Sequence, residues 1–286
     1  MTQNSHTAAR TDSWLPSLPL IGIKLLELRR RSALMVVTLV FTVGVPVIFY
    51  GIRAIYHLID PAHNGTAGAT NAFATAGSLM AEFGFIVAVL LGATAGTDDL
   101  TDGMFRQLVI TGRSRLALYL ARIPAGLAIL LSLSAIGYTL AALVTGFFNG
   151  PNTPGTFAPS VRALTGAGLW LELYLVIGFT LGLGLGVLMA QRTVPVVLLI
   201  VFEIIITPAL AGHAIPHFVN VERLVVGVAM DQLQPAVLAG GVHIGPGGGG
   251  GLMIPPMPTW AMTAVIAIWI IVWLGIGAWK MATRDA

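Results

Sequence analysis

Apolar residues occur along this chain in long blocks, and these blocks predict membrane-spanning helices. A helix needs about 20 apolar residues to cross a hydrocarbon core roughly 30 Å thick. Six segments meet that requirement, and Tyr, Trp and Phe residues mark many of their boundaries, as in interfacial aromatic belts. The predicted spans are 33–52, 71–96, 116–148, 169–190, 194–212 and 259–279. The pattern predicts an all-α, polytopic integral membrane protein with six transmembrane helices, which together form a domain over 33–280.

Composition supports the membrane class. Of the 286 residues 56% are hydrophobic and only 9% are charged, against roughly 25% charged in a typical soluble domain. With a mean hydropathy of +0.87, the chain cannot cover a water-facing surface, which excludes a soluble enzyme and a disordered protein. The chain has no cysteine, which excludes thiolate metal sites and thiol catalysis.

The basic residues predict the orientation. They lie at the ends of the apolar blocks rather than in a continuous stripe, so nucleic acid is not an expected partner. If both termini are cytoplasmic, twelve of the 15 basic residues lie inside, a strong positive-inside bias. The three outer ones are Arg53, Arg162 and Arg223. We expect a multi-pass protein of a prokaryotic cytoplasmic membrane, with membrane lipid as a partner.

The first 32 residues do not resemble a secretory signal, because Pro16 and Pro19 interrupt them and no cleavage-type site follows. Residues 1–16 are expected to be a flexible cytoplasmic segment and 281–286 a cytoplasmic tail. In 17–32, Leu18, Ile21, Leu25 and Leu28 recur at helical spacing, with Lys24, Glu27 and Arg31 on the other side. This predicts an amphipathic helix on the inner leaflet. A basic topology signal explains Arg29–Arg31 equally well, and the two interpretations are compatible.

The segment 213–258, between the last two predicted spans, is too long for a simple turn. Its middle, 221–239, has helical character, and 245–251 reads GPGGGGG, which is typical of a flexible connector. We expect a re-entrant outer hairpin, with an ordinary structured loop as the alternative.

The densest polar chemistry lies between the second and third spans. On a helical wheel, Leu100, Met104, Phe105, Leu108 and Val109 share one half, while Asp99, Asp102, Gly103 and Arg106 share the other. Acids suit the start of a helix, and Asp102 and Arg106 form a favourable i,i+4 pair. The pattern fits a short helix that carries force from a soluble partner, and it fits a solvated topology loop equally well.

The residues Asp99, Gly103, Arg106, Leu108, Thr111, Gly112, Ser114 and Arg115, followed by Arg122, resemble the cytoplasmic loop of type-2 ABC (ATP-binding cassette) exporter permeases. The sequence departs from the family at Met104, where Thr is usual, and at Gly112, where Pro is common. The resemblance implies that 99–110 is a coupling helix docking on an ATPase. It also implies that 221–239 belongs to a re-entrant hairpin. The implied coupling residues are Asp99, Asp102, Gly103, Phe105, Arg106, Leu108, Arg113 and Arg115.

The chain contains no ATP-binding loop. A Walker A motif needs a lysine after glycine, and neither Lys24 nor Lys280 follows one. If the resemblance holds, this chain has no cofactor and is not itself an enzyme, and ATP and Mg are bound by two separate ABC ATPase subunits. A second permease subunit, identical or homologous, completes the predicted assembly.

Carboxylates within predicted spans are candidates for a substrate pathway. Glu82 and Glu203 lie near the middle of the second and fifth spans, and Glu172 lies near an outer end. Because a charged residue costs about 2.5–3.5 kcal/mol on insertion scales, each should face protein or water. Glu82 and Glu203 either line a path for an amphipathic or cationic substrate or are protonated and hydrogen-bonded to another helix.

Two other patterns have a structural or chemical interpretation. Gly178, Gly182 and Gly186 form a small-residue face that favours close helix packing, within one subunit or between subunits. His213 and His217 have an i,i+4 spacing, but Pro216 disturbs the helix and no acid completes a zinc pattern, so no metal site is expected.

Together these features predict the permease subunit of an ABC exporter that moves a hydrophobic or amphipathic compound (an antibiotic, a peptide or a lipid) outward. Alternatives are a proton-coupled transporter that uses intramembrane glutamates and a membrane scaffold or immunity protein without transport. An intramembrane hydrolase is disfavoured, because no nucleophile set is recognisable.

Overall fold

The computed structural model of this protein describes residues 15–101, 114–149, 159–207, 209, 219–239 and 256–283. All of the regular elements in these residues are helices. They are α1 Leu18–Arg30, α2 Ser32–Leu39, η1 Val40–Gly44, α3 Val45–Ile59, α4 Thr70–Thr101, α6 Arg115–Phe147, α7 Val161–Met189, α8 Thr193–Val201, η2 Phe202–Ile206, α10 Val219–Glu222, α11 Val226–Gln232 and α12 Thr259–Thr283. The predicted all-α class is therefore confirmed.

Five of these helices are long and apolar enough to cross a membrane. They are Ser32–Ile59, Thr70–Asp98, Arg115–Phe147, Val161–Met189 and Thr259–Thr283. The predicted fifth span, 194–212, corresponds to the shorter apolar helix Thr193–Ile206, about 21 Å long at 1.5 Å per residue. Residues 208 and 210–218 lie outside the described residues. Five spanning-length helices and one shorter one thus define a multi-pass helical membrane protein.

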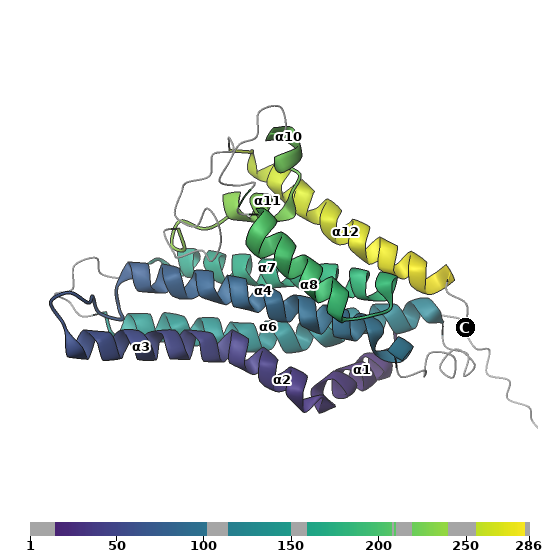
Figure 1. Ribbon diagram of the computed structural model, residues 1–286, viewed down its shortest axis with the longest axis horizontal. Helices are drawn as coiled ribbons and strands as arrows, with labels where there is room; N and C mark the ends of the chain where they lie inside the picture. The colour runs from purple at the N-terminus through teal and green to yellow at the C-terminus, as the bar shows by residue number, and fades with distance from the viewer. Residues whose placement is uncertain are drawn as a thin grey trace, which may run out of the picture.

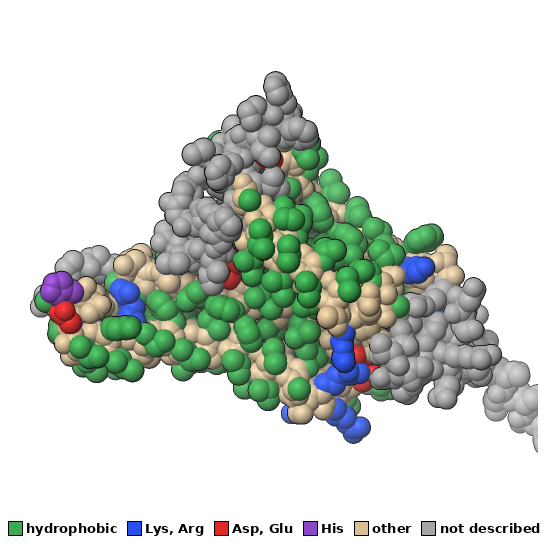
Figure 2. All heavy atoms as spheres, viewed as in Figure 1, with side chains coloured by type: hydrophobic (Ala, Val, Ile, Leu, Met, Phe, Trp, Pro, Cys, Tyr) green, Lys and Arg blue, Asp and Glu red, His purple; other side chains and the backbone are tan. Residues whose placement is uncertain are grey.

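Helices α4 and α7 form the centre of the bundle (Figure 1). The most apolar window of α4 is 72% buried and that of α7 is 78% buried, compared with 22% for Ser32–Ile59 and for α12. The outer helices leave large apolar side chains exposed, among them Ile48, Ile55, Leu143 and Ile271. Figure 2 shows this hydrophobic surface over the long helices. Such a surface suits a lipid environment rather than water.

Two of the apolar helical stretches contain a π-helical turn. Val40–Gly44 joins α2 to α3, and Phe202–Ile206 follows α8. Pro46 lies two residues after the end of the first of these turns. Because proline removes a backbone donor and clashes with the preceding turn, a widened turn just before it is expected. Single π turns inside helices also occur often at functional positions, and the second one places Glu203.

The segment after the fifth apolar helix packs on the bundle through two short helices, α10 and α11. Trp170 Nε1 donates to the Met230 carbonyl at 2.9 Å, and Trp269 Nε1 donates to the Leu224 carbonyl at 2.7 Å. Gln232 Oε1 accepts from the Met257 N–H at 2.9 Å. Within 221–239 the predicted helical character is thus present as short helices and turns. The glycine-rich stretch 245–251 lies outside the described residues.

Candidate functional site: an ionic cluster and a buried glutamate

Basic residues gather at one end of the bundle, which we call the basic end. It comprises α1, the last turns of α4, α7 and α12, and the first turns of α6 and α8 (Figure 1). Its basic residues include Lys24, Arg29, Arg30, Arg31, Arg115, Arg122, Arg192 and Lys280. Arg53 and Arg162 lie on α3 and α7 toward the opposite end. Of the twelve basic residues predicted to lie inside, the eight that the structure describes are thus at one end of the bundle, away from Arg53 and Arg162.

Five charged residues at the basic end join α1, α4 and α6, and we call them the ionic cluster: Lys24, Glu27, Arg31, Asp98 and Arg122. Lys24 Nζ lies 2.8 Å from Glu27 Oε2, and Arg31 Nη2 lies 3.0 Å from Asp98 Oδ1. Arg122 Nη1 donates to the Gly96 carbonyl at 3.0 Å. Arg122 is only 2% exposed and Asp98 only 5%, and charges so deeply buried are tolerated only when they are paired.

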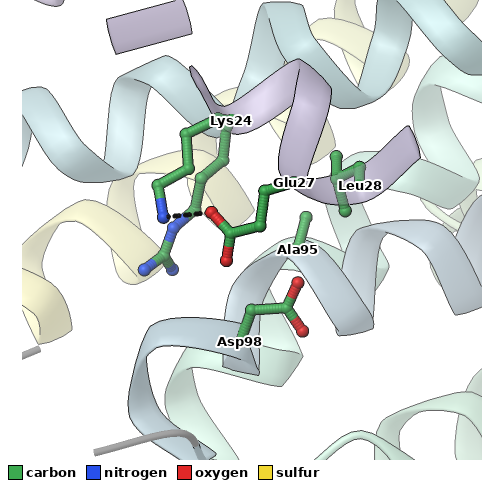
Figure 3. Close-up of a pocket in the computed structure, with 6 residues that line it drawn as sticks. Lys24, Glu27, Leu28, Ala95 and Asp98 are labelled. Carbon is green, nitrogen blue, oxygen red and sulfur yellow. Dashed lines mark hydrogen bonds and ion pairs between the residues drawn. The ribbon is translucent and has the colours of Figure 1, made fainter. Parts of the chain in front are cut away.

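The ionic cluster surrounds a small pocket. Figure 3 shows Lys24, Glu27 and Leu28 projecting from α1 toward Ala95 and Asp98 of α4. Arg122 lines the same pocket from α6. The Arg31–Asp98 ion pair joins the end of α1 to the end of α4, and the Arg122–Gly96 hydrogen bond joins α6 to α4. A displacement of the end of α4 must therefore rearrange both contacts.

The prediction that Lys24 lies on the water-facing side of the N-terminal helix was wrong. Leu20, Lys24 and Leu28 form the buried row of α1, so Leu28, expected on the lipid-facing side, shares the inner face with Lys24. Leu20 packs on Ala117 and Leu118 of α6. A charged residue can occupy this inner face because Lys24 pairs with Glu27 and lies in the same pocket as Asp98 of α4. A single-helix pattern contains no information about those neighbours.

The predicted coupling residues lie only partly in the described residues. Asp99 belongs to the last turn of α4, and Arg115 begins α6. Ser114 caps α6 by accepting the Ala117 N–H at 3.1 Å, as expected for an N-cap serine. Asp102, Gly103, Phe105, Arg106, Leu108 and Arg113 lie outside the described residues. The structure thus places the two ends of segment 99–115 at the basic end of the bundle.

Of the two candidate pathway acids, Glu203 is buried in a hydrogen-bonded group. The Tyr174 hydroxyl of α7 donates to Oε1, and Thr207 Oγ1 donates to Oε2 at 3.1 Å. Gly227 of α11 packs so closely that a Cβ there would lie 3.0 Å from Glu203 Oε1. Glu203 therefore connects the fifth apolar helix to α7 and contacts α11, which belongs to the segment predicted to be an outer hairpin or loop.

Glu82 lies on α4 and is only partly buried. It lies near Glu203 and Tyr174. Trp170 stacks on Tyr174, with ring centroids 5.5 Å apart. Chemically, this region offers carboxylates beside aromatic rings, a combination suited to holding a proton or attracting a cationic group. In the described residues no group of three or more His, Asp or Glu side chains is placed to hold a metal ion.

Removing one donor from Glu203 tests how strongly this carboxylate depends on its neighbours. We expect Tyr174→Phe to lower the free energy of unfolding by about 2 kcal/mol, because a hydrogen bond to a charged group contributes about 1.5–3 kcal/mol. Tyr56→Phe is the matched control, since Tyr56 is 57% exposed. Unfolding in mixed micelles, followed by tryptophan fluorescence, measures both. Equal stability of the two variants would contradict the assigned role of Tyr174.

The predicted small-residue face of α7 lies against α4. A Cβ on Gly178 would lie 2.9 Å from a Phe85 ring carbon, and one on Gly186 would lie 2.8 Å from the Ala93 carbonyl oxygen. A Cβ on Gly182 would come within 3.0 Å of the Val89 Cα. The two central helices thus approach each other backbone to backbone, as small-residue faces allow.

Sequence reasoning assigned Arg31 and Lys24 to membrane topology. It did not predict that Arg31 pairs with Asp98 or that Lys24 pairs with Glu27. The only available signal was the i,i+3,i+7 spacing of Lys24, Glu27 and Arg31, which places three charges on one helical face. Tyr174 carried no signal at all, because its contact with Glu203 joins residues far apart in the chain.

No protein-family model matches this chain, and a search of curated proteins found no match.

Proposed function

We propose that this chain is the membrane-spanning subunit of an ATP-driven ABC exporter. In this proposal the basic end faces the cytoplasm of a prokaryotic cell, in keeping with the positive-inside rule. Two ATPase subunits bind there, and a second permease subunit, identical or homologous, completes the transporter. The cargo is a hydrophobic or amphipathic compound (an antibiotic, a peptide or a lipid) that moves outward. ATP and Mg bind to the ATPase subunits.

The ionic cluster is the observation that supports the proposal most strongly. It lies where α4 and α6 meet α1, and α4 ends at Thr101, inside the predicted coupling segment 99–110. A push on this segment therefore acts on two long helices and on α1 at once. A solvated topology loop would not need Arg122 and Asp98 to be buried at its base.

The central helices offer a route for such a push across the bundle. Helix α4 is continuous from Thr70 to Thr101 and packs closely on α7 along the glycine face. Helix α7 in turn holds Glu203 through Tyr174. Because closely packed helices move as rigid bodies, displacement of the α4 end would reach the fifth apolar helix and the outer segment. Glu82 and Glu203 would then line or control the substrate path.

Co-purification and transport test the proposal directly. The full-length chain, expressed with its neighbouring genes and purified in mild detergent, is expected to bring down an ATPase subunit. Reconstituted vesicles should then export an amphipathic fluorescent compound when supplied with ATP and Mg. A chain that associates with no ATPase in any detergent or lipid nanodisc would contradict the proposal.

A substitution in the predicted coupling segment makes the test specific. Arg106→Ala should reduce ATP-driven transport about tenfold, within the usual range of coupling free energies between sites, while the ATPase subunits remain bound. The main reason is that Arg106 lies in the segment predicted to dock on the ATPase; loss of the predicted Asp102–Arg106 pair adds only a few tenths of a kcal/mol. Arg162→Ala, on the exposed start of α7, is the control and should transport normally. Normal transport by Arg106→Ala would show that the coupling helix lies elsewhere.

The buried Glu203 favours one second candidate, a proton-coupled transporter. A carboxylate with hydroxyl partners in an apolar helix is typical of proton relays. This function predicts transport that stops when an ionophore collapses the proton gradient and continues after ATP is depleted. The exporter proposal predicts the opposite result in the same vesicles.

A further inference from the structure

The exposed face of α1 combines apolar and basic residues. Leu18 is 82% exposed, Ile23 52% and Leu26 54%, and Arg29 and Arg30 in the last turn are also exposed. At about 100° per residue, these five side chains fall within an arc of about 140°. Along the helix axis the three apolar residues come first, and both arginines lie in the last turn.

The arc cannot be turned inward to hide these residues. Leu20, Lys24 and Leu28 occupy the inner face, and Arg31, directly after α1, pairs with Asp98. Rotating α1 to bury Leu18 and Leu26 would turn the buried Lys24 outward, break the Arg31–Asp98 contact and remove Leu20 from α6. The apolar and basic arc is therefore presented outward in the folded protein.

The position of α1 along the chain shows what surrounds the arc. Only Arg31 separates α1 from the spanning helix Ser32–Ile59, so the last turn of α1 lies where the chain enters the bilayer. Figure 2 shows basic side chains beside hydrophobic ones at this end of the molecule. An interfacial helix buries its apolar residues about 5–10 Å deep and leaves its charges among the headgroups.

We propose that the outer face of α1 is a binding surface for anionic phospholipid, with Leu18, Ile23 and Leu26 among the acyl chains and Arg29 and Arg30 on headgroup phosphates. Guanidinium groups bind phosphate oxygens in a bidentate geometry, which suits them to this role. The negative charge of the lipid complements the two exposed arginines. Because Arg31, directly after α1, pairs with Asp98 of α4, bound lipid would also hold the end of α4 in place. The surface does not depend on what the protein transports.

Fluorescence quenching by brominated lipid tests the surface in the full-length protein. The natural chain has no cysteine, so Leu26→Cys can be labelled uniquely with an environment-sensitive fluorophore. In vesicles of phosphatidylcholine and phosphatidylglycerol, either brominated lipid should quench the label, and iodide in the water should not. From the quenching curves, we expect brominated phosphatidylglycerol to associate about three- to tenfold more strongly than brominated phosphatidylcholine.

Removing the charges of Arg29 and Arg30 distinguishes recognition of anionic lipid from simple insertion of the apolar side chains into the bilayer. Arg29→Gln combined with Arg30→Gln should bring the ratio of the association constants for phosphatidylglycerol and phosphatidylcholine close to one. Arg29→Lys combined with Arg30→Lys keeps the positive charge and should largely preserve the ratio. Both arginines are exposed, so neither pair of substitutions removes a core contact. A label at Phe147→Cys, at the other end of α6, should give a ratio near one in every variant.

Three outcomes would overturn the proposal. If iodide quenches the label at position 26 and brominated lipid does not, the outer face of α1 lies in water. Protection from both quenchers would show that another protein chain covers it. A ratio of one with both arginines present, or a ratio unchanged by the glutamine pair, would show that Arg29 and Arg30 do not recognise the negative charge of the lipid.

Discussion

Gly182→Leu is expected to destabilise the protein by about 3 kcal/mol or more, at the upper end of the cost of overpacking a core. A Cβ at this position would already lie within 3.0 Å of the Val89 Cα, and Val89 belongs to the backbone of α4. A backbone cannot move aside as a flexible side chain does. The two central helices would have to separate, which would expose apolar surface along both of them.

Gly166→Leu is the matched control, because Gly166 lies on the same helix and has nothing within 4 Å of its Cβ position. Leucine is a better helix former than glycine by roughly 0.5–1 kcal/mol, so this variant should be as stable as the parent or slightly more stable. Thermal unfolding in detergent, followed by fluorescence-detected size-exclusion chromatography, compares the two. Equal melting temperatures would mean that α4 and α7 do not pack as described.

The long helices were predictable from the sequence because lipid exposure leaves a strong local signal. Predicted spans such as 116–148 and 259–279 match α6 and α12 closely at their starts. The ends differ, because helices continue beyond the hydrocarbon core: α12 runs to Thr283 and the first span to Ile59. Hydropathy detects the solvent around a helix but not the point where its hydrogen bonding stops.

The features that require two helices were not predictable to the same extent. Gly182 was recognisable as part of a small-residue stripe, but the stripe did not show that α4 packs against it. Glu203 was recognisable as a costly buried acid, but Tyr174, its donor, lies on another helix. A single sequence shows which residues need a neighbour, and the fold determines which neighbour they receive.

The face of α1 shows how such reasoning can give the wrong answer. Charges at helical spacing were interpreted as the outward side, since a lone surface helix points its charges to water. In the structure Lys24 is 7% exposed, because residues of α4 and α6 surround its side chain with protein rather than with water or lipid. The inner face therefore carries a buried charge between two leucines, and the outer face is partly apolar.

The same environment gives Asp98 a large expected effect. Asp98→Asn preserves the shape of the side chain and removes its charge, so Arg31 loses its ion pair beside the buried Arg122. Removing one partner of a buried ion pair costs about 3–5 kcal/mol, because an uncompensated charge stays behind. Asp60→Asn is the matched control: its side chain is 45% exposed beside His63, so the change should cost no more than about 1 kcal/mol.

A double-mutant cycle assigns this effect to the pair itself. Arg31→Met removes the other member, and the double variant should be more stable than the sum of the two single losses predicts, by about 0.5–3 kcal/mol. Unfolding in mixed micelles measures all three variants against the parent. Additive losses would mean that Asp98 stabilises the protein through other contacts.

If the ionic cluster transmits force, vesicles carrying a folded Asp98→Asn variant should hydrolyse ATP but transport less per ATP consumed, because the end of α4 would no longer move together with α1.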